Sequence, residues 1–166
     1  MKSNNSSERK NSTFFFDLCK EKFNYLITEY DFSLFSKRKD RNLYKIIFRN
    51  KTTAVIVHWE RNENWIYIEL YRLVTGKLTT DPINISAQTE INGYYLDDLL
   101  SIRHPGFLPI KSPIDDRDIE DVLTDYSVML RQHADDVLNG NFAIFGELEK
   151  VVKSRIASHK QKDEPN

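Results

Sequence analysis

The stretch LYKIIFRNKTTAVIVHWERNENWIYIELYRL, residues 43–73, decides the fold of this chain of 166 residues. It contains segments in which apolar side chains alternate with polar or aromatic ones, and short polar breaks separate these segments. Alternation with a period of two is typical of β-strands, and breaks of this length are typical of hairpin turns. The pattern predicts an antiparallel β-meander with strands over 43–49, 53–60 and 65–73.

The third segment divides its side chains between the two faces of the predicted sheet. Successive residues of a strand point to opposite faces, so the aliphatic Ile66, Ile68 and Leu70 share one face. The aromatic residues of the other face are Trp65, Tyr67 and Tyr71. We expect helices to cover both faces, which places these aromatics in the core. If helices cover only one face, the aromatics form an exposed patch of the composition enriched at protein interfaces.

Apolar residues at helical spacing predict four helices around the meander. The first begins after Ser12 or Thr13, either of which can cap the exposed amides. The longest begins at Ser112 and Pro113 and ends at Asn139 and Gly140, because these residue types favour helix starts and helix ends. The first predicted helix ends at Ile27, and the other three cover 94–102, 113–138 and 142–157. Residues 31–37 are predicted to form an edge strand that precedes the meander.

These elements predict a single α+β domain over residues 12–157. Its antiparallel meander of three to four strands packs against an N-terminal helix and a C-terminal helical layer. The segments 1–11 and 158–166 are polar and charged, so we expect disordered tails there. No apolar window reaches the roughly 18 residues that span a bilayer, and a single cysteine, Cys19, suits a reducing compartment. We therefore expect a cytoplasmic protein with no membrane segment, in which Cys19 packs as a small hydrophobic residue.

Charge is divided unevenly along the chain. The net charge is +6 over residues 1–80, −10 over 81–149 and +3 over 150–166, although the total is only −1. Such asymmetry either steers a charged partner or reflects complementarity within one fold. The acidic excess is concentrated on the longest predicted helix, opposite its apolar stripe, in a ridge that includes Asp115, Asp116, Asp118, Asp121 and Asp125. A dense helical ridge of one sign predicts a docking surface for a basic protein partner.

Several classes of chemistry lack a motif in this sequence. The four histidines are far apart, the five glycines are scattered, and no serine or cysteine lies on a glycine-flanked elbow. We therefore expect no metal site and no cofactor. Nucleic-acid binding would use the basic cluster 37–41 beside the strand aromatics. We rank it below protein binding, because the strands lack a basic-aromatic motif and the chain is slightly acidic.

The order of a helix, a meander and an acidic C-terminal helical pair resembles, in architecture and size, small bacterial proteins that include immunity proteins neutralising a toxin domain. The charge asymmetry and the absence of a catalytic motif predict a non-enzymatic protein-binding module, of the immunity or antitoxin kind, which acts through the acidic ridge or the aromatic sheet face. One alternative is a small enzyme with a site near Arg103 and His104. Another is a structural or regulatory domain that forms a homo-oligomer through an exposed strand or its aromatics.

Overall fold

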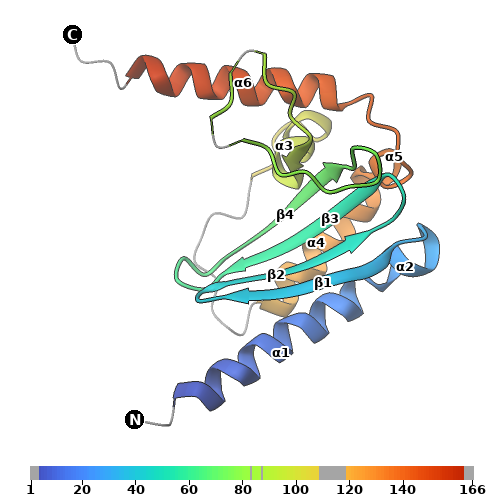
Figure 1. Ribbon diagram of the computed structural model, residues 1–166, viewed down its shortest axis with the longest axis vertical. Coiled ribbons are helices and arrows are strands. Elements are labelled where there is room, and N and C mark those ends of the chain that lie inside the picture. The colour runs from blue at the N-terminus through green and yellow to red at the C-terminus, as the bar shows by residue number, and fades with distance from the viewer. Residues whose placement is uncertain (1–3, 83, 87, 109–118, 163–166) are drawn as a thin grey trace.

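The computed structural model describes residues 4–82, 84–86, 88–108 and 119–162, and it shows one antiparallel sheet with helices before and after it (Figure 1). The five strands lie side by side in the order in which they occur along the chain. They are β1 (Ser33–Asp40), β2 (Leu43–Arg49), β3 (Thr53–Glu60), β4 (Trp65–Arg72) and β5 (Gly93–Tyr95). The predicted α+β class and the antiparallel meander are confirmed.

The fifth strand is a correction to the prediction of three to four strands. β5 has three residues and pairs with the second half of β4, so that Tyr95 lies opposite Glu69 and Gly93 opposite Tyr71. A strand this short is too brief to show a periodic pattern, and it follows a polar connection rather than a hairpin turn. Its position in the sheet depends on tertiary packing, which the sequence pattern does not record.

Six helices flank the sheet within the described residues. They are α1 (Asn4–Lys22), α2 (Asn24–Glu29), α3 (Leu96–Arg103), α4 (Ile119–His133), α5 (Asp135–Leu138) and α6 (Phe145–Lys162). In Figure 1, α4 lies behind the sheet and α6 lies beyond its upper end. The outer ends of α1 and α6 reach into the segments 1–11 and 158–166, which the sequence predicts to be tails. Once a helix is nucleated, each further residue adds a backbone hydrogen bond, so polar residues can extend it.

Two predicted helices are each divided in two. The first breaks at Phe23, whose φ and ψ are −103° and 16°, and the longest breaks at Ala134, at −121° and 16°. Both residues are fully buried, so each break turns the chain where its side chain enters the core. Tertiary packing overrides helix continuity at these points. The predicted start of the longest helix at Ser112 and Pro113 lies outside the described residues.

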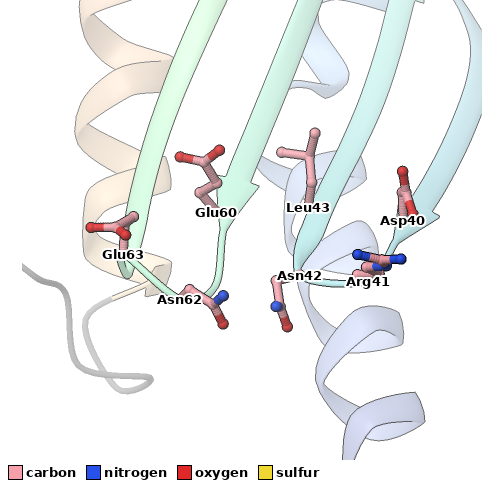
Figure 2. A pocket seen from close by; sticks show the side chains of 7 residues that line it. All are labelled: Asp40, Arg41, Asn42, Leu43, Glu60, Asn62 and Glu63. Atoms are coloured by element: carbon pink, nitrogen blue, oxygen red, sulfur yellow. The ribbon is translucent and has the colours of Figure 1, made fainter.

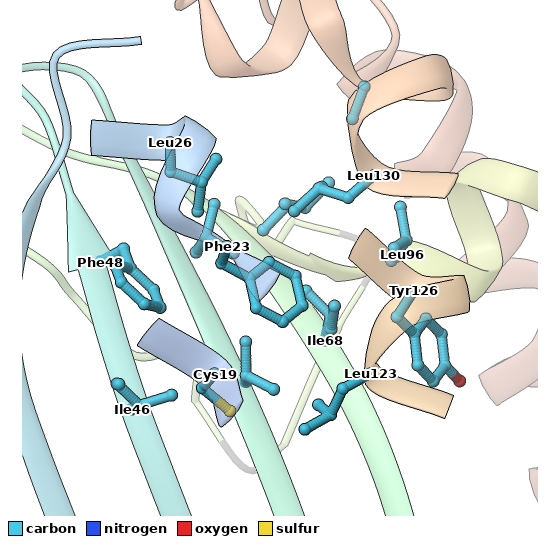
Figure 3. Packing of buried hydrophobic residues seen from close by; sticks show 14 of the residues in the cluster. Cys19, Phe23, Leu26, Ile46, Phe48, Ile68, Leu96, Leu123, Tyr126 and Leu130 are labelled. Carbon is cyan, nitrogen blue, oxygen red and sulfur yellow. The ribbon is translucent and has the colours of Figure 1, made fainter. Parts of the chain in front are cut away.

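The main core lies between the helices and one face of the sheet, which we call the inner face. Figure 3 shows Phe23 between Phe48 of β2 and Tyr126 of α4, with Cys19 one turn away on α1. The rings of Phe23 and Phe48 have centroids 6.3 Å apart. Cys19 is fully buried, as predicted, and burial raises the pKa of its thiol. Each such buried side chain stabilises the fold by about 1.5–3 kcal/mol relative to exposure.

The opposite face of the sheet, the outer face, has a second and smaller apolar cluster that includes no helical residue. Its members are Ile47, Ala54, Ile56, Tyr71 and Leu73, with Leu78 packed against them. Leu78 follows a tight turn in which Val74 and Lys77 form a β-bridge. Among the described residues, helices therefore cover only one face of the sheet. The expectation that helices cover both faces is wrong, because a connecting loop covers one end of the outer face.

Candidate functional site: the outer face of the sheet

Strand register determines which side chains share the outer face. Arg38, Lys45, His58 and Tyr67 lie opposite one another on four successive strands and form one row across the sheet. The next row toward the hairpin turns has Glu60 opposite Trp65. The row on the other side has Ile56 opposite Glu69 and Glu69 opposite Tyr95. Rings, carboxylates and basic groups from separate strands therefore meet on one surface.

Aromatic rings form a continuous series over β3, β4 and β5, which we call the aromatic row: His58, Trp65, Tyr67 and Tyr95. The rings of His58 and Tyr67 are stacked, with centroids 4.4 Å apart and planes at 7°. The Tyr67 ring also contacts the Trp65 ring, with centroids 4.5 Å apart, and meets the Tyr95 ring edge-on, with centroids 5.6 Å apart. Tyr95 is 41% exposed, and Trp65 and Tyr67 are half-buried. Part of the ring surface of the row is therefore accessible, on side chains that contact one another.

His58 of the aromatic row forms a part-buried hydrogen bond with Glu69. Nε2 of His58 is 2.7 Å from Oε2 of Glu69, and His58 is only 4% exposed. Its other ring nitrogen, Nδ1, is buried without a hydrogen-bond partner among the described residues. A catalytic histidine has to reach its substrate with the free nitrogen, whereas here that nitrogen is inaccessible and the ring is covered by Tyr67. The geometry favours a role in which Glu69 orients His58, and His58 in turn supports the Tyr67 ring.

Carboxylates lie near Tyr67 and Tyr95. Burial raises the pKa of Tyr67, and the Glu69 and Glu60 carboxylates raise it further. Burial and the same two carboxylates also raise the pKa of Tyr95. At the edge of the site, Asp98 of α3 forms an ion pair with Arg155 of α6, whose side chain is half-exposed. A cation near these rings would gain both Coulomb attraction and contact with aromatic faces.

A polar hollow of about 480 Å³ continues this surface toward the hairpin turns. Figure 2 shows Glu60 and Glu63 on one side of it and Asp40 with Arg41 on the other. The remaining lining residues are Asn42, Leu43 and Asn62. Among the described residues, no three carboxylates, imidazoles or thiols converge in a way that could hold a metal ion. Carboxylate and amide oxygens around an open hollow instead suit a basic side chain of a partner.

Of the predicted aromatic residues, Tyr71 belongs to the fold rather than to the exposed surface. It is 8% exposed and packs in the outer apolar cluster. Its ring lies so close to Gly93 that a Cβ at that position would be 2.2 Å from Cε1 of Tyr71. Trp65 and Tyr67 are therefore the two predicted aromatics that reach the surface, and Tyr71 holds β5 against β4.

The predicted acidic ridge is only partly described. Asp115, Asp116 and Asp118 lie outside the described residues, and Asp121 and Asp125 are exposed on α4. Neighbouring acids of the same helical layer have partners within the chain. Glu120 accepts from Lys22 at 2.9 Å, Asp135 accepts from the Tyr30 hydroxyl at 2.7 Å, and Asp136 pairs with Arg103. Some of the acidic residues that cause the charge asymmetry therefore pair with groups of the same chain.

Arg103, one of the two residues named for the alternative enzyme site, forms an ion pair within the fold. Its guanidinium donates to both carboxylate oxygens of Asp136, at 2.7 and 2.6 Å, and also to the carbonyl of His133. The Arg103 guanidinium lowers the pKa of Asp136. His104 stacks on His133 with ring centroids 5.9 Å apart. These contacts tie α3 to the ends of α4 and α5, which is a structural role for Arg103.

Sequence reasoning missed the pairing of His58 with Glu69 and the contribution of Tyr95. A signal for the first was present, because a four-residue turn over 61–64 sets Glu60 opposite Trp65. Moving two residues along each strand from that pair places His58 opposite Tyr67. Glu69 is the next residue of β4 on the same face. No comparable signal marks Tyr95, because β5 joins the sheet through a long connection.

Comparisons with known proteins give no functional assignment: no family model, no curated protein and no solved structure matches this chain. Within the parts of the chain that the structure describes, no helix has both the length and the apolar character needed to cross a bilayer.

Proposed function

We propose that this protein is a non-enzymatic binding module that recognises a basic protein partner through the outer face of its sheet. The observation that carries the proposal is the aromatic row, which no helix of the described residues covers and whose Tyr95 is 41% exposed. An aromatic surface left open on an otherwise packed sheet is typical of an interaction site.

The composition of the surface supports this proposal. Tryptophan, tyrosine and arginine supply most of the binding energy at protein interfaces, and this face combines Trp65, Tyr67 and Tyr95 with Arg155 at its edge. The rings are already held by mutual stacking, so binding orders few additional rotamers. Little of the interaction energy is then lost to side-chain entropy.

The charge of the surface supports a basic partner. The carboxylates of Glu60 and Glu69 act on both exposed tyrosines, and Glu63 and Asp40 line the adjoining hollow. Arginine or lysine side chains gain by stacking on tyrosine and tryptophan next to carboxylates. A basic toxin domain, the target expected from the likeness in element order to immunity proteins, is one class of partner to test.

Site-specific photocrosslinking in the source cell tests the proposal. A photoreactive phenylalanine analogue replaces Tyr95 in one variant and Val128 in a control variant, because Val128 is exposed to a similar degree, at 47%, but lies on α4. We expect the analogue at position 95 to capture one basic protein that the analogue at 128 does not capture. A crosslinked product formed only by the analogue at position 128 would place the partner on the acidic ridge near Asp121 and Asp125. That result would contradict the outer-face site.

A further inference from the structure

The β1–β2 hairpin has the densest positive charge of the molecule. Residues 33–51 contain seven lysines and arginines and one acid, Asp40. Among the described residues, no carboxylate forms an ion pair with Arg38, Lys45 or Lys51. Elsewhere, basic groups such as Lys22 and Arg131 pair with acids of another element. The charges of Arg38, Lys45 and Lys51 are therefore available to an external partner.

The same hairpin has one of the two edges of the sheet that the described residues form. β1 is the first strand in the sheet order, and among the described residues it pairs with β2 alone. Almost the whole strand is exposed, including the apolar Leu34 and Phe35 at its beginning. A free edge offers unpaired backbone groups to which an extended segment can add as a further strand.

Two features of β1 disfavour pairing with a second copy of this chain. The register shifts between Leu34 and Ser36, which is a bulge of the kind that disturbs regular pairing. In addition, Lys37, Arg38 and Lys39 are consecutive near the middle of the strand. In an antiparallel pairing of two β1 strands over their full length, residues 37–39 of one strand would lie opposite 34–36 of the other. The two basic runs would then be adjacent across the pair, and like charges close together on neighbouring strands are destabilising.

We propose that β1 is a docking site for an extended acidic segment of a protein partner, which joins the sheet as an additional strand. Alternation along β1 places Arg38 on the outer face, next to Lys45, and Lys37 on the inner side, next to Ile46. Three consecutive acidic residues on the added strand therefore meet basic groups on both faces. Apolar residues that follow them would cover Leu34 and Phe35, where the Arg49 guanidinium already stacks on Phe35 at 3.7 Å.

This surface is separate from the aromatic row, and its test uses a peptide of known sequence. The probe is a capped peptide of the length of β1, with three consecutive glutamates followed by threonine, valine and isoleucine. A control peptide has lysines in place of the glutamates. Binding is followed by backbone amide shifts and amide hydrogen exchange of the full chain at about 0.15 M salt, where interactions beyond roughly 8 Å are screened.

Matched charge reversals on the protein separate docking on the strand edge from general attraction. Arg38→Glu reverses a charge on β1, and Lys51→Glu makes the same change in the turn between β2 and β3, outside the strand that the peptide would pair with. We expect the glutamate peptide to bind, the lysine peptide not to bind, and β1 amides to become protected from exchange. Arg38→Glu should weaken binding at least tenfold more than Lys51→Glu does.

Three results would overturn the proposal. The first is no binding of the glutamate peptide at millimolar concentration. The second is binding that both charge reversals weaken equally, which would indicate attraction without strand addition. The third is tighter binding of single-stranded oligothymidylate of equal charge at the same residues, which would make the hairpin a phosphate-binding surface. Tyr95→Ser should leave peptide binding unchanged, so this inference and the proposed function fail or succeed separately.

Discussion

The contact between Gly93 and Tyr71 predicts a large effect of a single methyl group. In Gly93→Ala the new Cβ would lie 2.2, 2.3 and 2.6 Å from three ring atoms of Tyr71. Carbon atoms normally approach to about 3.5–4.0 Å, so the ring has to move by more than ~1 Å. Tyr71 is buried in the outer apolar cluster, with Ala54 as its cross-strand neighbour on β3, and has little room for that movement.

Overpacking of this kind costs about 1–3 kcal/mol. We expect Gly93→Ala to lower the free energy of unfolding by about 2 kcal/mol, measured by urea denaturation, and to lower Tm by roughly 4–8 °C for a chain of this length. Gly146→Ala is the matched control, because a Cβ at Gly146 meets nothing within 4 Å. That variant should be as stable as the wild type or slightly more stable, since alanine favours helix.

A double-mutant cycle identifies the cause of the effect. Tyr71→Ala alone should destabilise by about 3 kcal/mol through loss of a buried ring. In the Gly93→Ala background the same change also removes the steric conflict, so it should cost about 2 kcal/mol less, which is the coupling energy. The reasoning is refuted if the two changes add within ~0.5 kcal/mol, or if Gly93→Ala leaves stability unchanged.

Three further variants or probes test contacts that hold the elements together. Asp136→Asn should lower the free energy of unfolding by about 1–2 kcal/mol at pH 7 in urea denaturation. Arg103 lowers the pKa of Asp136 in the folded state, so the carboxylate stabilises the fold at pH values above the unfolded-state pKa near 3.8. The stability difference between the variant and the wild type should vanish as the pH falls below the folded-state pKa of Asp136. Asn50→Ala should cost about 2–3 kcal/mol in the same assay, because its amide donates to the Leu138 carbonyl at 3.1 Å and its oxygen accepts backbone amides of the turn; an effect below ~0.5 kcal/mol would contradict that role. The Cys19 thiol should react with a disulfide reagent only as the chain unfolds in urea, and rapid reaction in the native state would contradict its burial.

The sequence predicts the meander well because each of its strands has its own local pattern. The strands over 43–60 are flanked by polar breaks, and the structure places β2 and β3 over the predicted segments 43–49 and 53–60. β1 was also expected, although the structure sets it at Ser33–Asp40 rather than 31–37. Its shift illustrates that a strand boundary depends on pairing, here the pairing of Asp40 with Leu43 across the turn.

Features set by long-range packing were not predictable in this way. The breaks at Phe23 and Ala134 occur inside periodic apolar patterns that read as continuous helices. The absence of a helix over the outer face among the described residues could not be predicted either, because the pattern of β4 fits coverage by helices on one side or on both. Tyr95 reaches the aromatic row only because β5 pairs with β4 across a long connection.

The affinity of the partner captured at position 95 is the most direct test of the central claim that the outer face binds a basic protein. Titration of that purified protein against Tyr95→Ser and against Val128→Ser compares a residue of the aromatic row with an exposed residue of α4. The account predicts at least tenfold weaker binding for Tyr95→Ser, equivalent to about 1.4 kcal/mol, with Val128→Ser within about twofold of the wild type. Equal affinities for the wild type and Tyr95→Ser, with both chains folded, would contradict it.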